Sequence, residues 1–206
     1  MANQIKGVYE EVIEIAKQEF LENGFQKASL RTIATKANTT TGSIYTRFGD
    51  KEGLFSAIVE PTATELIAMF TQIQQAFCQF SEEQQQKLVG EYASDNLDSM
   101  IDYMYEHFTD CKLLLEYAED TKYADFSNRF VEIEEEYTQK YIAYLGCSIL
   151  GNKKMDYDII HMISTAYFES FFEIIRHNME IEKAKSYFKV LGEYHLAGFK
   201  SIFHLN

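Results

Sequence analysis

The sequence predicts an all-α protein, and three observations support this fold class. Apolar residues recur at steps of three and four through most of the 206 residues, the spacing that places them on one face of a helix. One proline and ten glycines are too few for the many turns of a β-sandwich or barrel. Hydrophobic residues form 46% of the chain, enough to build a globular core. We therefore expect about nine helices.

The first helix is predicted to end at the sequence "ENGF". Gly24 suits the left-handed residue that follows a helix end, and Phe25 then falls where it packs back on Phe20. The inner face of this helix consists of Ile5, Val8, Val12, Ile15, Ala16 and Phe20.

Two short helices follow, separated by a tight turn. Ser29 is placed to cap the first, and Thr40 is placed to cap the second. Asn38 in the turn tolerates a positive φ angle. The inward residues are Leu30, Ile33, Ala34 and Ala37 in the first helix, and Ile44 and Phe48 in the second.

Asp50 is placed to cap a fourth helix, which we expect to run towards Phe80. Pro61 lies inside it and should kink the helix or end its first part, because the proline ring clashes with the preceding turn. This position is either a hinge or a tolerated kink without a role. Further helices are predicted over 82–92, 94–108, 110–119, 124–147, 156–178 and 181–204.

The two short helices have the arrangement of a helix-turn-helix, whose second helix enters the DNA major groove. Hydroxyls and an arginine suit phosphate oxygens and base edges, and Gly42 lets the backbone approach the groove. Lys51, in the first turn of the next helix, is placed for a phosphate. The alternative is an ordinary solvated surface helix. The predicted DNA contacts are Arg31, Thr32, Thr40, Thr41, Gly42, Ser43, Tyr45, Thr46, Arg47 and Lys51.

The charge distribution agrees with a local DNA-binding face. The whole chain has a net charge of −13, whereas residues 24–51 hold five basic residues against one acidic residue, a net charge of +4. An acidic protein with a basic face at one end is able to bind DNA through that face.

The segment "SLRTIATKANTTTGSIYTRFGDKEGLF" resembles the helix-turn-helix of the TetR family of bacterial transcriptional regulators. The resemblance covers about the first 55 residues. It rests on "ENGF", on "IA" in the second helix, on Gly42 to Tyr45, on "RF" at 47–48 and on "DKEGLF". Asn38-Thr39-Thr40 replaces the Gly-Val-Ser usual in the family, and Arg47 stands where histidine is common.

This resemblance implies a homodimer that binds a palindromic operator in double-stranded DNA, usually as a repressor. It also implies a DNA-binding domain over 1–50 and an effector-binding and dimerisation domain over 51–206. A small-molecule effector, which we expect to be hydrophobic or aromatic, would enter the second domain and move the two DNA-reading heads out of register.

The last two predicted helices fit the dimer interface of the family. The helix over 156–178 is apolar nearly all round, and the helix over 181–204 carries an apolar stripe. An ordinary monomer core is the alternative. The predicted interface residues are Ile163, Phe172, Tyr187, Phe188, Leu191, Tyr194, Gly198 and Ile202.

Effector-binding residues are predicted from large, adaptable side chains, which equally fit a plain core. They are Met69, Phe70, Met104, Phe108, Tyr117, Tyr137, Tyr141, Tyr167 and Phe171. The acidic residues Glu132, Glu134, Glu135 and Glu136 are predicted to form a solvated face. The acidic character of this half favours a cationic, lipophilic effector.

The chain shows no nucleophile elbow, phosphate-binding loop or metal-ligand spacing, so we expect no enzymatic activity, no cofactor and no metal. An α-helical carrier or enzyme with an accessory helix-turn-helix is the alternative function. The three cysteines are widely spaced, and neither a signal peptide nor a membrane-spanning run is expected. These features predict a cytoplasmic protein without a membrane partner.

Overall fold

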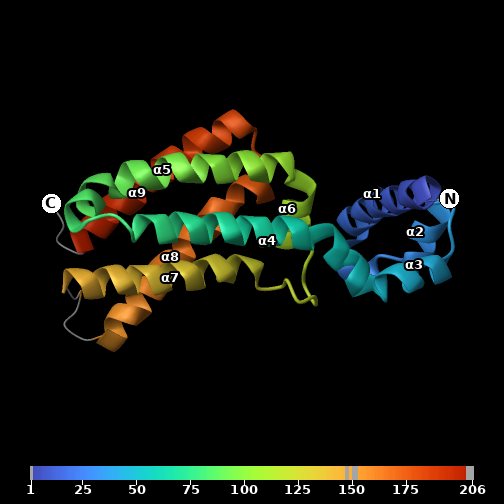
Figure 1. Ribbon diagram of the computed structural model, residues 1–206, viewed down its shortest axis with the longest axis horizontal. Coiled ribbons are helices and arrows are strands. Elements are labelled where there is room, and N and C mark those ends of the chain that lie inside the picture. The colour runs from blue at the N-terminus through green and yellow to red at the C-terminus, as the bar shows by residue number, and fades with distance from the viewer. Residues whose placement is uncertain (1, 147–148, 150–152, 203–206) are drawn as a thin grey trace. The chain divides into compact units, whose positions relative to one another are not determined.

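The computed structural model describes the backbone of residues 2–146, 149 and 153–202. Within these residues the chain forms nine α-helices and no strand, which confirms the predicted all-α class (Figure 1). The helices are α1 (Ala2–Lys27), α2 (Leu30–Lys36), α3 (Thr41–Phe48), α4 (Lys51–Phe77), α5 (Glu82–Glu106), α6 (Phe108–Glu116), α7 (Phe126–Leu145), α8 (Lys153–Arg176) and α9 (Ile181–Ile202).

The chain divides into two compact units. The N-terminal unit consists of Met1–Glu65 and His107–Phe126, and the C-terminal unit consists of Leu66–Glu106 and Ser127–Asn206. The N-terminal unit therefore contains α6 and the first part of α4 in addition to the three N-terminal helices. The functional division at residue 50 stays a prediction, since these units are defined by packing alone.

The end of the first helix follows the prediction. Gly24 interrupts α1 with φ 70° and ψ 168°, a backbone conformation that suits glycine. The ring of Phe25 then packs back on Phe20, with ring centroids 6.0 Å apart. Both rings contact Phe55 of α4 at 5.1 and 5.4 Å, so the break in α1 is part of the core of the N-terminal unit.

Caps and a turn set the geometry of α2 and α3. The Ser29 hydroxyl accepts a hydrogen bond from the Thr32 amide at 3.3 Å, and the Thr40 hydroxyl accepts one from the Ser43 amide at 3.1 Å. Asn38 in the connecting turn has φ 49°. All three predicted roles are confirmed.

The start of α4 is fixed against the end of α3. Asp50 Oδ1 accepts a hydrogen bond from the Gly53 amide at 2.7 Å, which confirms the predicted cap. At Gly53 a Cβ atom would lie 1.8 Å from the carbonyl oxygen of Phe48. Only glycine therefore allows this close approach of the two helices.

A buried ion pair joins three helices of the N-terminal unit. Lys17 Nζ of α1 lies 2.7 Å from Asp110 Oδ1 of α6, and the Thr62 hydroxyl of α4 donates to Asp110 Oδ2 at 3.3 Å. Asp110 is only 7% exposed. Because removing one partner would leave a buried charge, this contact ties α6 firmly to α1 and α4.

Aromatic rings form the core of the C-terminal unit. Phe130 of α7 contacts Phe70 of α4 at 5.5 Å and Phe172 of α8 at 5.1 Å, and Phe171 contacts Phe188 of α9 at 5.0 Å. α5 packs along α9 on the same unit (Figure 1). These contacts bring five helices of the C-terminal unit together.

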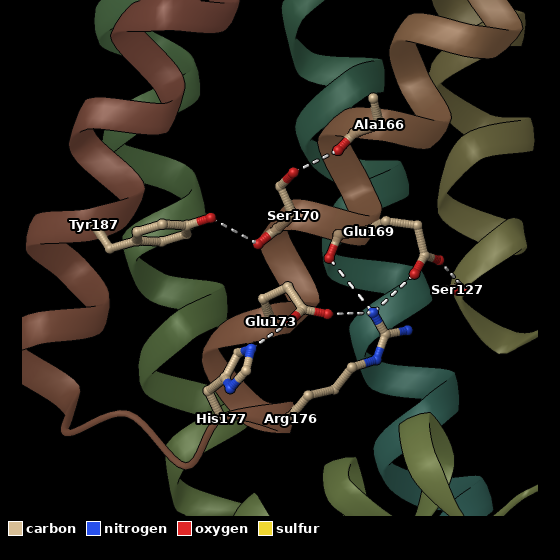
Figure 2. A network of polar contacts seen from close by, with 8 residues as sticks. All are labelled: Ser127, Ala166, Glu169, Ser170, Glu173, Arg176, His177 and Tyr187. Atoms are coloured by element: carbon tan, nitrogen blue, oxygen red, sulfur yellow. Dashed lines mark hydrogen bonds and ion pairs between the residues drawn. The ribbon is translucent and has the colours of Figure 1, made fainter.

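A polar network fastens the end of α8 (Figure 2). The Arg176 guanidinium donates to Glu169 at 2.8 Å and to Glu173 at 3.0 Å, and Ser127 at the start of α7 also donates to Glu169 at 3.0 Å. His177 pairs with Glu173 at 2.7 Å. An arginine in the last turn of a helix also complements the helix dipole.

Several predicted boundaries are corrected. The two helices predicted over 82–92 and 94–108 are one helix, α5, which runs on through Gly90, because a single glycine weakens a helix without ending it. α4 does not end at Pro61 and stops at Phe77. The predicted helix ends at 147 and 204 lie outside the described residues.

No helix was expected to be apolar enough to span a membrane, yet α4 meets that test by length and composition. Its apolar side chains are used inside the protein, with Leu54 and Phe55 buried in the N-terminal unit and Leu66 and Phe70 buried in the C-terminal unit. A core helix satisfies the same criterion, so α4 is explained by its packing.

Candidate nucleic-acid interface

α3 has one buried face and one polar, exposed face. Ile44 is 1% exposed and packs inward, whereas Tyr45 is 54% exposed. The side chains at Ser43, Thr46 and Arg47 are also exposed. This arrangement presents hydroxyls and a guanidinium on one surface, the donors and acceptors that phosphates and base edges require.

The hydroxyls of α3 are partly occupied by the helix itself. The Thr46 hydroxyl donates to the carbonyl oxygen of Gly42 at 2.8 Å. The Thr40 and Ser43 hydroxyls lie 2.9 Å apart. Each hydroxyl also carries acceptor lone pairs, so these contacts orient the groups without exhausting their capacity for hydrogen bonds.

Arg47 is held by an aromatic pair. Its guanidinium carbon lies 4.4 Å from the centroid of the Tyr9 ring of α1, and Tyr9 stacks on Phe48 at 5.7 Å. Stacking on an aromatic face orients the guanidinium while its N–H groups point outward in the plane. An open groove between α1 and α3 surrounds this cluster, and its lining is Val8, Tyr9, Val12, Thr39, Thr40, Gly42, Ser43, Ile44, Thr46, Arg47 and Phe48.

Lys51 is placed differently from the expectation. Its ammonium donates to the carbonyl oxygens of Gln26 at 2.8 Å and Ala28 at 3.4 Å, and it lies 4.8 Å from the centre of the Phe25 ring. Two of its three protons therefore cap the end of α1. A phosphate contact stays a prediction, and it would use the remaining proton.

The other predicted contacts lie around this face. Arg31 is exposed on α2, and Thr32 and Thr41 are half-buried. Lys36, which contributes to the local positive charge, lies 3.5 Å from the buried carboxylate of Glu19. Arg31 and Arg47 are therefore the arginines that this surface offers to phosphate.

Two positioning residues were not predicted from the sequence. Tyr9 holds Arg47, and Gly53 permits the contact between α4 and α3. Gly53 could have been recognised from the sequence. A glycine inside a helix destabilises it by about 1 kcal/mol relative to alanine, which suggests that another part of the chain packs closely against it. The role of Tyr9 could not be recognised in this way, since a tyrosine beside the apolar stripe of a helix is usually an ordinary, partly buried residue.

The predicted effector-binding residues do not all come together. Phe108 and Tyr117 belong to the N-terminal unit, and the other seven belong to the C-terminal unit. Among those seven, Phe70, Met104, Tyr141 and Phe171 are buried, and Met69, Tyr137 and Tyr167 are half-buried.

The predicted dimer residues also divide by burial. Phe172 and Phe188 lie in the core of the C-terminal unit, so they have no surface to offer a partner, and the prediction is corrected for these two. Tyr194 is 78% exposed, and Gly198 is exposed as well. The half-buried members are Ile163, Tyr187, Leu191 and Ile202. Met162 and Val190, which were not among the predicted residues, are also large and apolar and about two-thirds exposed.

The geometry defines an all-α protein whose N-terminal helices form a helix-turn-helix of the DNA-binding type. Residues 12–58 match the family model described as bacterial regulatory proteins, tetR family. These residues are therefore a helix-turn-helix domain of the tetR family, and the resemblance seen in the sequence is confirmed.

Curated relatives match over the same region. The chain is 36% identical over 67 residues to the uncharacterised HTH-type transcriptional regulator YvdT of Bacillus subtilis, which covers 32% of this chain and 34% of that protein. It is 40% identical over 60 residues to the probable acrEF/envCD operon repressor of Escherichia coli, which covers 28% of this chain and 27% of that protein. The matches thus span about a third of the length of these relatives.

Solved structures extend the similarity to the whole fold. NalD of Pseudomonas aeruginosa, the secondary repressor of the MexAB-OprM multidrug efflux pump, matches with a TM-score of 0.60 at 15% identity, covering 95% of this chain and 97% of that chain. FadR of Bacillus subtilis, solved in complex with stearoyl-CoA, matches with a TM-score of 0.55 at 12% identity, covering 89% and 97%. At these identities the similarity shows the fold alone.

Proposed function

We propose that the chain is a ligand-responsive transcriptional regulator that acts in the cytoplasm as a repressor. A homodimer would bind a palindromic operator through α3, and a small-molecule effector in the C-terminal unit would release it. The observation that carries this proposal is the exposed polar face of α3, which lies within residues 12–58, the part of the chain that matches the tetR-family model.

The dimer is supported by an unpartnered surface on the last two helices. Met162 of α8 and Val190 and Tyr194 of α9 are exposed. Val190, Tyr194 and Gly198 share one face of α9 at steps of four, and a Cβ atom at Gly198 would meet no atom within 4 Å. An exposed apolar face with a glycine suits a second helix packed closely against it.

Effector control is supported by the architecture of the C-terminal unit and by the relatives. The E. coli and Pseudomonas proteins are described as repressors, and the Bacillus FadR structure holds a bound acyl-CoA. An effector acts only if it binds the released state more tightly than the DNA-bound state, and a tenfold loss of operator affinity requires about 1.4 kcal/mol of differential binding. The carrier or enzyme alternative gains no support from these relatives.

The experiment is a reporter assay built on DNA fragments selected by the purified protein from a random pool. Wild-type protein should repress a promoter that overlaps the selected site, and Arg47→Ala should relieve repression because it removes a phosphate contact. Glu11→Ala on the exposed side of α1 serves as a matched surface control. Unchanged repression by Arg47→Ala would contradict the assignment of α3, and absence of any selected site would contradict DNA binding itself.

A further inference from the structure

Arg47 of α3 is held by an aromatic ring, whereas two other arginines of the chain are held by carboxylates. Arg129 and Arg176 each pair with glutamates of their own helices, at distances between 2.8 and 3.6 Å. The Arg47 guanidinium carbon lies 4.4 Å from the centre of the Tyr9 ring, and no ion pair among the described residues involves Arg47. A carboxylate would cancel the charge and occupy N–H groups, but an aromatic face does neither. Arg47 therefore keeps its charge and its in-plane donors for an anion.

The place of Arg47 on α3 favours a phosphate over a base edge as its partner. In a recognition helix the N-terminal residues contact the base edges. Arg47 belongs to the last turn of α3. A planar guanidinium donates two parallel hydrogen bonds to a phosphate, but only when its plane is correctly oriented. The orientation of this side chain therefore matters as much as its charge.

Tyr9 is itself fixed by its neighbours. Its ring stacks on Phe48 with centroids 5.7 Å apart and an interplanar angle of 18°, and the side chain is half-buried. Val12 of α1 and Ile44 of α3, which are 3% and 1% exposed, line the same groove. The ring thus stands on the packed contact between α1 and α3. A guanidinium placed over this ring takes its position from that contact.

The placement of Arg47 over the ring in the free protein should improve DNA binding. An arginine side chain loses rotamer freedom when it binds a phosphate, and this loss weakens the complex. A guanidinium that Tyr9 already holds in place loses less of that freedom. The attraction between ring and cation also persists in the complex, because the N–H groups that bind a phosphate lie in the guanidinium plane. Tyr9 would therefore strengthen DNA binding without contacting DNA.

Tyr9 lies outside the segments that carry the predicted DNA contacts. It belongs to α1, before α2 and α3, and it also precedes residues 12–58, which match the family model. Neither the helix-turn-helix pattern nor the family match therefore assigns it a role. The contacts of Tyr9 with Arg47 and Phe48 are what connect it to the DNA-binding face.

We propose that Tyr9 is a positioning residue for DNA binding, which holds the Arg47 guanidinium in the orientation that a DNA phosphate requires. The inference rests on the proposed contact of α3 with operator DNA, and it adds α1 to the elements that determine affinity. Tyr9 acts through Arg47, so its effect on DNA binding should vanish when Arg47 is removed. A phosphate contact carries no direct sequence information, so the effect should be the same for every DNA sequence.

The first test measures affinity, by fluorescence anisotropy, for a duplex that the wild-type protein selects from a random pool. Tyr9→Leu removes the aromatic face and should lower the affinity at least about threefold, while Tyr9→Phe keeps the face and should stay within about twofold of wild type. Tyr144→Leu makes the same change at a tyrosine of α7 that is 61% exposed, and it should have no effect. A smaller loss in Tyr9→Leu, or an equal loss in Tyr9→Phe, would overturn the proposal.

A double-mutant cycle separates positioning from a general effect on the fold. In the Arg47→Ala background, Tyr9→Leu should change the affinity by less than about twofold. The same loss in both backgrounds would show that Tyr9 acts through the stability of the N-terminal unit, and it would refute the proposal. A second comparison uses duplexes with single base changes. Tyr9→Leu should weaken binding to all of them equally, and a lost preference at one base position would contradict the phosphate contact.

A measurement on the wild-type protein keeps the proposal testable if Tyr9→Leu does not fold. The chain has four arginines, so their Nε–H groups give few NMR signals. The signal that is absent from Arg47→Ala should lie upfield of ordinary arginine signals, because the ring current of Tyr9 shields protons above its face. An unshifted Arg47 signal would contradict the proposal. If Arg47→Ala weakens DNA binding and Tyr9→Leu does not, only the role of Tyr9 fails. If the wild-type protein binds no DNA, the proposed function fails as well.

Discussion

Gly42 offers a test in which stability and DNA binding should change in opposite directions. A Cβ atom at this position would meet only the Thr40 hydroxyl oxygen, at an ordinary contact distance of 3.7 Å. The fold therefore does not require glycine here. Glycine inside a helix costs about 0.8–1.0 kcal/mol relative to alanine, and at the second residue of a short helix we take roughly half of that. Gly42→Ala should stabilise the protein by about 0.5 kcal/mol.

The same methyl group should weaken DNA binding. It would stand between α3 and the groove, so the helix would have to withdraw, and removal of a good base contact costs about 1–3 kcal/mol. We expect an operator affinity about 5- to 150-fold lower, measured by fluorescence anisotropy, with a melting temperature raised by about 1–2 °C. Unchanged DNA affinity, or a lower melting temperature, would refute the placement of α3 against DNA.

Gly53→Ala is the matched control for this experiment. Here a Cβ atom would lie 1.8 Å from the Phe48 carbonyl oxygen, so the α3–α4 contact must open. Overpacking of this kind costs about 1–3 kcal/mol. Stability and DNA binding should therefore fall together in Gly53→Ala, whereas they separate in Gly42→Ala.

Asp110→Ala should lower the free energy of unfolding by about 3 kcal/mol in urea titrations, because the partly buried Lys17 keeps only the more distant Glu14 as a partner and the buried Thr62 hydroxyl loses its acceptor. Tyr194→Glu should yield folded monomers in sedimentation velocity experiments, because the exposed aromatic ring is replaced by a charge at the proposed interface. The wild-type protein should lose stability relative to Glu134→Gln as the pH rises above 4.5. Burial raises the pKa of the Glu134 carboxyl group in the folded state, so this group favours folding only while it is protonated.

Each of these outcomes has a clear contrary result. A stability loss for Asp110→Ala no larger than that of the exposed pair mutant Glu136→Ala would show that the Lys17 contact contributes little. A dimeric Tyr194→Glu would place the interface elsewhere. If wild type instead became more stable than Glu134→Gln as the pH rises, the prediction for a buried carboxyl group with a raised pKa would be wrong.

The local structure of the N-terminal helices was predictable because short-range chemistry determines it. Ser29, Thr40 and Asp50 cap their helices through their own side chains, and Asn38 and Gly24 adopt positive φ angles that few other residues tolerate. Each of these features depends on residues within a few positions in the sequence. A single sequence carries that information directly.

Long-range contacts were not predictable in the same way. The pairing of Lys51 with the end of α1 depends on how α4 and α1 meet, and the fixed position of Arg47 depends on Tyr9, 38 positions away in the sequence. The inward turn of Glu134 is likewise decided by Gln74 on another helix. Residue type alone suggested a phosphate contact for Lys51 and a solvated face for Glu134.

The most direct test of α3 as the DNA-reading helix is a pair of selections from the same random DNA pool. Wild-type protein and Tyr45→Ala, which removes a side chain that is 54% exposed on α3, are each used to enrich bound duplexes. If α3 lies in the major groove of both half-sites, wild-type protein enriches a palindrome, and Tyr45→Ala relaxes the base preference at one position and at its symmetry-related position. Identical preferences at every position of the two selected sites would contradict the account.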